Sequence, residues 1–182
     1  MKRIRIFFTA VAILFVQTVI AQKYTPVDDG SGVKFKIKNF GVTVGGSFNG
    51  LKGMIQFDAV KLTSSNFDVS VESSTVNTGL GSRDKHLRKE DYFNVEKFPA
   101  INIKSTKLTA ANKEGWLYFF GTLTLKGVTK EISFPFQVTQ KDGGYVFTGE
   151  FKINRRDYGV GGSSVILSDN LTVNLSVFAK KS

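Results

Sequence analysis

LYFFGTLTLKGVTKEISFPFQVTQKDGGYVFTGEFKI, residues 117–153, decides the fold of this chain. Within three runs of this stretch, an apolar residue or a glycine occupies every second position. A strand with one apolar and one polar face is typical of an antiparallel sheet that has one side in water. The three apolar lines are Leu117, Phe119, Gly121, Leu123 and Leu125; Ile132, Phe134, Phe136 and Val138; and Tyr145, Phe147, Gly149, Phe151 and Ile153.

The same alternation continues on both sides of this stretch, and turn signals separate the runs. Asn49-Gly50 lies between two alternating runs and predicts a hairpin, and Asp142-Gly143-Gly144 predicts another turn. Pro135 cannot donate to a ladder, so it predicts an edge position or a bulge. No long helical period appears, and the pattern predicts an all-β barrel or sandwich. The other runs are 33–38, 42–48, 51–57, 67–72, 101–104 and 171–177.

One segment, residues 78–93, breaks the strand pattern. Ser82 can cap a helix, Asp84 suits its first turn, and Arg88 and Lys89 suit its last turn. These signals predict a short helix from about Arg83 to Asp91, with Tyr92 and Phe93 packing inward.

The N-terminus predicts export from the cytoplasm. Lys2, Arg3 and Arg5 precede the apolar run 6–16, and a small residue, Ala21, ends the segment. This order is typical of a secretory signal peptide, and the apolar run is shorter than the roughly 18 residues of a spanning helix. We therefore expect a signal peptide at residues 1–21, a single mature domain at residues 22–182, and a periplasmic or secreted location.

The amino-acid composition of that domain excludes several kinds of site and indicates the charge of its partners. The chain has no cysteine, which excludes disulfides, thiol catalysis and cysteine-bound metals. Its formal charge is +10, of which +7 stays on residues 22–182. Such a surface attracts anionic partners, although nucleic acid is not expected outside the cytoplasm. Lys34, Lys36 and Lys38 share one strand face and either dock peripherally on an anionic membrane surface or form an ordinary wet, edge-protecting face.

The sequence offers no convincing catalytic or metal site. His86 is the single histidine, so neither a histidine pair for a metal nor a placed triad can be nominated. Asp84, Glu90 and Asp91 lie among basic residues, as in helix-stabilising ion pairs. Asp28-Asp29 is interpreted as a solvated N-terminal approach. We expect no enzyme activity, no cofactor and no metal.

The apolar faces are rich in aromatic residues and carry glycines, and two interpretations stay open. The chain has 17 phenylalanines. Either the interior is filled and glycine relieves strand curvature, or missing side chains leave room for an apolar ligand. An eight-stranded barrel permits both. The glycines concerned are Gly46, Gly53, Gly121 and Gly149.

Four motifs, taken in order, resemble the YceI-like, polyisoprenoid-binding family over essentially all of residues 22–182. One departure is Asn39, which stands in Lys38-Asn39-Phe40-Gly41 where family members often carry histidine. Any role of that histidine is therefore not transferred. The motifs are RDKHLR (83–88) with DYF (91–93); FP (98–99) with Ile101 and KST (104–106); GTLTLKGVTK (121–130); and INR (153–155) with DYGV (157–160).

The resemblance implies an extended, lipocalin-like, eight-stranded antiparallel barrel with a short helical insert. It also implies a tunnel that holds a long-chain apolar lipid such as an isoprenoid, an isoprenoid quinone or a fatty-acid derivative, for carriage or sequestration. The alternatives are a filled structural or interaction barrel, and an enzyme on a lipid-like substrate that uses Asp84 or His86.

The expected ligand contacts fall into two groups. Head-group contacts at the mouth are expected from Arg83, Asp84, His86 and Arg88. Tunnel-lining contacts are expected from Phe35, Ile37, Phe48, Phe57, Val69, Ile103, Phe119, Phe134, Phe136, Phe147, Phe151 and Val173.

Overall fold

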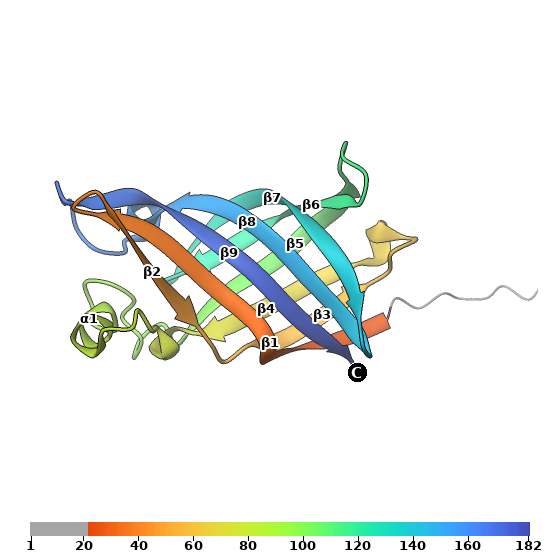
Figure 1. Cartoon of the computed structure of the whole chain (residues 1–182), viewed down its shortest axis with the longest axis horizontal. Coiled ribbons are helices and arrows are strands. Elements are labelled where there is room, and N and C mark those ends of the chain that lie inside the picture. Colours follow the sequence, from red (N-terminus) through yellow and green to blue (C-terminus); the bar gives the residue numbers. More distant parts are fainter. Residues whose placement is uncertain (1–21) are drawn as a thin grey trace, which may run out of the picture.

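The computed structural model describes residues 22–182, so the signal peptide predicted for residues 1–21 lies outside the described residues. Within residues 22–182 the chain forms nine antiparallel strands and one short α-helix, α1 (Gly81–Leu87) (Figure 1). Three short 3-10 turns cover Leu62–Ser64, Ser73–Thr75 and Arg155–Tyr158. The strands are β1 (Gln22–Asn39), β2 (Val42–Phe48), β3 (Lys52–Phe57), β4 (Asn66–Glu72), β5 (Ala100–Ala110), β6 (Trp116–Leu125), β7 (Val128–Lys141), β8 (Gly144–Asn154) and β9 (Leu167–Lys181).

The strands close into a barrel with eight positions, which confirms the predicted fold class. Each strand from β3 to β9 pairs with the next, and β9 pairs with β1 to close the ring. Residues 33–39 of β1 pair with β2, whereas residues 22–24 pair with β3. Both strands run antiparallel to the same neighbour, so β2 and β3 together fill one position of the barrel.

The predicted hairpin at Asn49-Gly50 is therefore wrong. These residues interrupt one barrel strand instead of reversing it, and Gly50 takes a positive φ of 76° at the break. The real hairpin joins β1 to β2 through Phe40 and Gly41, both of which also have positive φ. The sequence signal was ambiguous because Asn-Gly suits any backbone that needs a left-handed residue.

Asp28 is exposed, as the prediction of a solvated side chain expected, and it also holds the strand break in place. Its Oδ2 accepts a hydrogen bond from the Gly50 N–H and its Oδ1 one from the Leu51 N–H, each at 3.0 Å. Two backbone donors that the broken ladder leaves free are thereby satisfied.

The helical insert exists, but α1 begins and ends earlier than predicted. Ser82 lies inside α1, and no side chain caps the helix at Leu80. After Arg88 the chain turns, and the Phe93 N–H donates to the Leu87 carbonyl at 3.0 Å. The helix ends early because Phe93 must turn back into the core, where its ring lies 5.3 Å from that of Phe48. The prediction that Phe93 packs inward is confirmed.

Pro135 lies where one ladder of the barrel ends. It pairs with Tyr118 of β6, but β8 pairs with β7 only from Phe136 onward. This position needs no proline N–H on the β8 side, as expected for an edge. Among residues 22–182, no helix has the length and apolar character needed to cross a membrane.

Asp28→Ala should lower the free energy of unfolding by about 1–2 kcal/mol, since two backbone N–H groups lose an ionised acceptor. The measurement is urea unfolding followed by circular dichroism. Asp29→Ala is the matched control, because Asp29 is exposed and bonds no described residue. Equal effects of the two substitutions would contradict the assigned role of Asp28.

Candidate functional site

A large cavity occupies the barrel interior and reaches the end that carries α1. Its volume is about 380 Å³, within the ~300–1,000 Å³ range of small-molecule sites. The side chains that line it are mostly aliphatic and aromatic. The end of the barrel formed by α1, the Phe40–Gly41 turn and residues 155–166 is called the mouth below; it lies at the left in Figure 1.

The structure places eleven of the twelve expected tunnel residues around this cavity. Their contact with a ligand stays a prediction. The twelfth, Phe57, does not line the cavity and packs beyond it. The eleven are Phe35, Ile37, Phe48, Val69, Ile103, Phe119, Phe134, Phe136, Phe147, Phe151 and Val173.

Aromatic side chains fill the barrel end opposite the mouth. The ring of Phe57 lies 5.4 Å from those of both Tyr145 and Phe147. Tyr24 adds an edge contact to Tyr145 at 5.2 Å. Edge-to-face packing of this kind stabilises the cluster beyond its simple burial. Because Tyr24, Phe57 and Tyr145 do not line the cavity, the cavity ends at this cluster and its polar end is the mouth.

Inward glycines contribute less space than the hollow-barrel interpretation expected. Gly149 lines the cavity, but Gly46, Gly53 and Gly121 do not. A Cβ on Gly121 would lie 2.2 Å from the Lys104 carbonyl oxygen, and one on Gly53 would lie 2.1 Å from the Asp68 carbonyl oxygen. These two glycines therefore serve close backbone approach, not ligand room.

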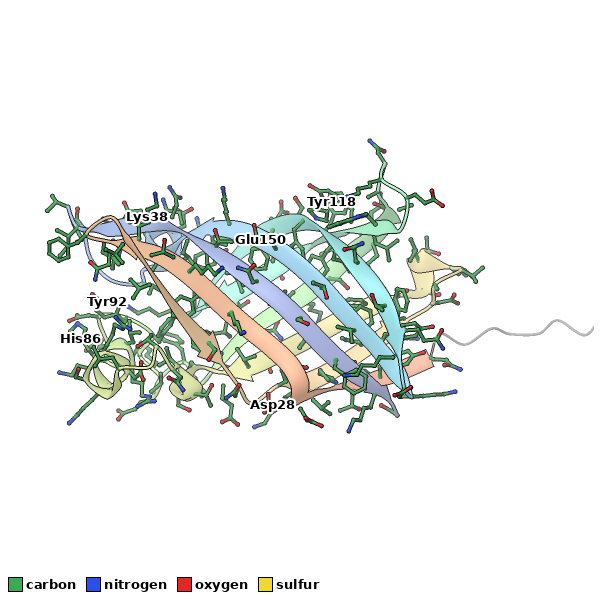
Figure 2. The ribbon with its side chains drawn as sticks, in the orientation of Figure 1. Asp28, Lys38, His86, Tyr92, Tyr118 and Glu150 are labelled. Carbon is green, nitrogen blue, oxygen red and sulfur yellow. The ribbon has the colours of Figure 1, made fainter. Side chains whose placement is uncertain are left out.

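The four residues expected at the mouth divide into two pairs. Arg83 and His86 line the cavity, and the His86 ring lies 4.9 Å from that of Tyr92 (Figure 2). Asp84 and Arg88 do not line it and hold the insert together instead. Arg88 donates to the carbonyls of Ser74 and Val76 at 2.7 and 3.2 Å.

Asp84 is the anchor of the insert. Its Oδ1 accepts hydrogen bonds from the Thr78 N–H at 2.8 Å and from the Thr78 hydroxyl at 2.5 Å. These bonds, the hydroxyl bond foremost, lower the pKa of the Asp84 carboxyl below its usual value against an opposing effect of burial. The carboxylate is therefore committed to structure and not free to act as an acid or base.

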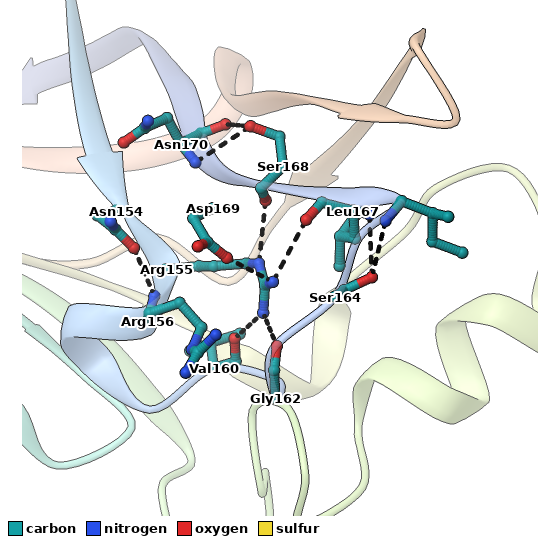
Figure 3. Close-up of polar contacts among 11 residues, drawn as sticks. Asn154, Arg155, Arg156, Val160, Gly162, Ser164, Leu167, Ser168, Asp169 and Asn170 are labelled. Atoms are coloured by element: carbon teal, nitrogen blue, oxygen red, sulfur yellow. Dashed lines mark hydrogen bonds and ion pairs between the residues drawn. The ribbon is translucent and has the colours of Figure 1, made fainter.

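Sequence reasoning missed the role of Arg155, which organises the mouth loop (Figure 3). Its side chain is 2% exposed. Its Nη1 donates to Val160 and Gly162 carbonyls at 2.9 Å, and its Nη2 contacts Asp169 Oδ1 at 2.7 Å. Nε donates to the Ser168 carbonyl at 3.0 Å. The INR motif marked this residue, but no spacing rule could show that its partners lie up to fourteen residues further along the chain.

The cavity lining also includes polar residues that were not expected there, among them Asn39, Thr78 and Arg155. The Asn39 Oδ1 is buried and has no hydrogen-bond partner among the described residues. A buried acceptor without a partner is costly unless a ligand or water completes it. Asn39 is thus a candidate acceptor for a head-group donor.

The site combines a mostly apolar wall with a few polar groups. Within residues 22–182, no three His, Asp or Glu side chains gather where they could hold a metal ion. The cavity wall is mostly apolar, and Asn39, Thr78, Arg83, His86 and Arg155 place donors and acceptors at the mouth. Such a wall suits an elongated apolar molecule with a polar terminus.

Comparisons with known proteins agree with this geometry. A family profile described as "YceI-like domain" matches residues 24–179. A UPF0312 protein of Pseudomonas fluorescens is 36% identical over 161 residues, which is 81% of each chain. The structure of BcnA from Burkholderia cenocepacia superposes with a TM-score of 0.77 at 21% identity, covering 82% of this chain and 96% of BcnA. A polyisoprenoid binding domain from Saccharophagus degradans gives 0.70 at 16% identity, covering 87% and 98%.

Arg155→Met should lower the free energy of unfolding by about 2–3 kcal/mol, because it removes the ion pair with Asp169 and the charge-assisted hydrogen bonds to the carbonyls of Val160, Gly162 and Ser168. Thermal and urea unfolding measure this loss. Arg156→Met is the control: its side chain is exposed and bonds no described residue. A loss no larger than that of the control would contradict the organising role of Arg155.

Asp84→Asn should make the Tm change less between neutral pH and pH values well below 4. The lowered pKa of Asp84 means that its contribution is complete above the unfolded value, about 3.9, and is lost as pH falls through the folded value. The Tm difference between wild type and variant should therefore be larger at neutral pH than well below pH 4. An equal difference at both pH values would show that the ionised carboxylate contributes nothing.

Proposed function

Because the chain belongs to the YceI-like family, we propose that it binds a long-chain apolar lipid in the barrel cavity. The lipid is an isoprenoid, an isoprenoid quinone or a fatty-acid derivative. The single observation that carries the proposal is the apolar cavity, closed by aromatic rings at one end and edged by polar side chains at the other. A solved protein of the same fold is described as a polyisoprenoid binding domain, which supports this ligand class.

The two ends of the cavity differ in polarity, and this difference sets the direction in which a lipid binds. The apolar chain enters first and comes to rest against the aromatic cluster. Each methylene that leaves water contributes about 0.8 kcal/mol, so a long chain binds with few polar contacts. The depth of the cavity and the width of its wall then select chain length and branching.

The polar terminus of the lipid stays at the mouth. Arg83 and His86 supply donors there, and Asn39 Oδ1 supplies an unused acceptor. These groups suit a hydroxyl, carbonyl or carboxylate terminus, since each can be matched by a donor or an acceptor. They act as head-group contacts and not as catalysts, and the protein functions as a carrier or a store without a cofactor.

The compartment proposed for this activity is the periplasm or the extracellular space. The motive is the sequence of residues 1–21, which is typical of a signal peptide. An apolar lipid needs a protein shell to cross such an aqueous space. N-terminal analysis of exported protein that showed Met1 retained would contradict this location.

Val173→Trp should abolish most lipid binding by filling the cavity. Val173 lies on β9 between Phe35 of β1 and Phe151 of β8, and all three line the cavity. The affinity for a dansyl-labelled long-chain fatty acid and for ubiquinone should fall at least tenfold. Fluorescence titration measures this change.

The control is Thr172→Trp. Thr172 is the next residue of the same strand and points to the opposite face, between Lys36 and Lys152. It adds the same bulk outside the barrel and should leave binding unchanged. If both variants fold and bind the probes as the wild type does, the cavity is not the lipid site.

A further inference from the structure

Four large apolar side chains are exposed at the mouth: Phe40 in the β1–β2 turn, Val42 at the start of β2, and Val165 and Ile166 in the loop before β9. Phe40 is 72% exposed, Val42 68%, Val165 104% and Ile166 41%. The Phe40 N–H donates to the Ile166 carbonyl at 2.8 Å, which joins the β1–β2 turn to the loop before β9. These four residues are called the apolar tip.

The apolar tip lies directly beside the entrance of the cavity. Asn39 precedes Phe40 and Leu167 follows Ile166, and both line the cavity. The two loops form the far left end of the barrel in Figure 1, at one limit of its long axis. Whatever surface the tip contacts therefore faces the entrance.

Phe40 is unfavourable for its backbone conformation and for the turn in which it lies. It is a bulky residue with a positive φ of 50°, in a turn whose second residue, Gly41, has φ 74°. Turns of this kind favour Asn-Gly, and an aromatic residue there is unfavourable. Neither the turn nor the core needs this ring, since most of it faces water. A bulky, exposed ring in a turn that disfavours it points to a contact outside the chain.

Lysine side chains of β1 lie next to the apolar tip, further from the end of the barrel. Lys38 lies two residues before Phe40, about 7 Å along the strand at 3.3 Å per residue. Lys36 lies in register with Thr172 and Lys152 across β1, β9 and β8. Glu150 belongs to the next row back, and Figure 2 shows it further from the mouth than Lys38. Lysine stems can extend toward anionic head groups while apolar side chains sit ~5–10 Å deep in the interface.

We propose that the apolar tip docks the mouth of the barrel onto an anionic lipid bilayer. Phe40, Val42, Val165 and Ile166 enter the interface, and Lys36 and Lys38 meet the head groups. The proposal rests on the proposed lipid function, because the bilayer is the source or the destination of the apolar ligand. End-on docking lets an apolar chain move between bilayer and cavity without crossing open water.

Flotation with vesicles tests this docking. Wild type should bind vesicles of mixed phosphatidylcholine and phosphatidylglycerol more tightly than phosphatidylcholine alone, and added salt should weaken the difference. Phe40→Asn should lower the affinity for the mixed vesicles about tenfold, or about 1.4 kcal/mol. It should not lower the Tm, because asparagine suits the turn better than phenylalanine.

Val165 provides a second test of the apolar tip, and Val60 provides its control. Val165→Asp should weaken vesicle binding as Phe40→Asn does. Val60 is 98% exposed in the loop after β3, at the opposite end of the barrel. Val60→Asp makes the same change in an equally exposed loop and should leave vesicle binding unchanged. Equal losses from both valine variants, or none from Phe40→Asn, would overturn the proposal.

Tryptophan emission of the wild-type protein reports which side of the barrel meets the bilayer. Trp116, the single tryptophan, lies with Tyr118 and Phe120 on the outer face of β6, toward the end opposite the mouth. End-on docking should leave its emission unshifted when vesicles are added. A blue shift would show that this second aromatic group contacts the bilayer, and would contradict docking by the tip.

Soluble-probe binding separates this proposal from the proposed function. Phe40→Asn and Val165→Asp should bind the dansyl-labelled fatty acid normally in vesicle-free buffer, since neither side chain lines the cavity. Wild type that binds the probe but no vesicles would refute the docking alone. Wild type that binds vesicles through the tip but no probe would uphold the docking and refute the lipid cavity.

Discussion

The whole structure depends on the long strand β1, which pairs along both of its edges. One edge follows β9 from Tyr24 to Asn39, and the other meets β3 and then β2. This double pairing turns an antiparallel sheet into a closed ring, and β7 keeps an unpaired edge over residues 128–135, where β8 does not reach it. Closure also forces the apolar face of every strand to point inward, because side chains alternate along each strand. Without disulfides, the barrel is stabilised by this closure and by the packing it encloses.

The barrel interior is filled by aromatic rings at one end and is hollow toward the other. Phe57, Tyr145 and Phe147 pack against one another where β1 meets β3, and they leave no room for a ligand. Toward the mouth, β2 replaces β3 and the helical insert crosses the end of the barrel (Figure 1). Arg155 holds the loop after β8 from within, because its guanidinium donates to the carbonyls of Val160, Gly162 and Ser168. A cavity with a dry end and a polar end is the result.

Period-two alternation predicted this fold correctly because it is a local property of each strand. It also predicted most of the cavity wall, since residues of one parity share a face of the sheet. Phe57 was misplaced because parity gives the face of a strand and not the height along the barrel axis. Asn49-Gly50 was misread because a left-handed glycine suits both a reversal and a break in a strand. Asp28 and Arg155 were missed because most of their partners are backbone groups, whose positions depend on the path of the folded chain and not on residue type.

The central claim is that the cavity holds one lipid chain, with its polar end at the mouth. The most direct test is mass spectrometry of an organic extract from protein that has been exposed to membranes and purified without detergent. The account predicts a retained long-chain apolar lipid, close to one per protein chain, that is missing from Val173→Trp and present in Thr172→Trp. Folded wild-type protein that yields no lipid, or yields as much as the cavity-filled variant, would contradict it.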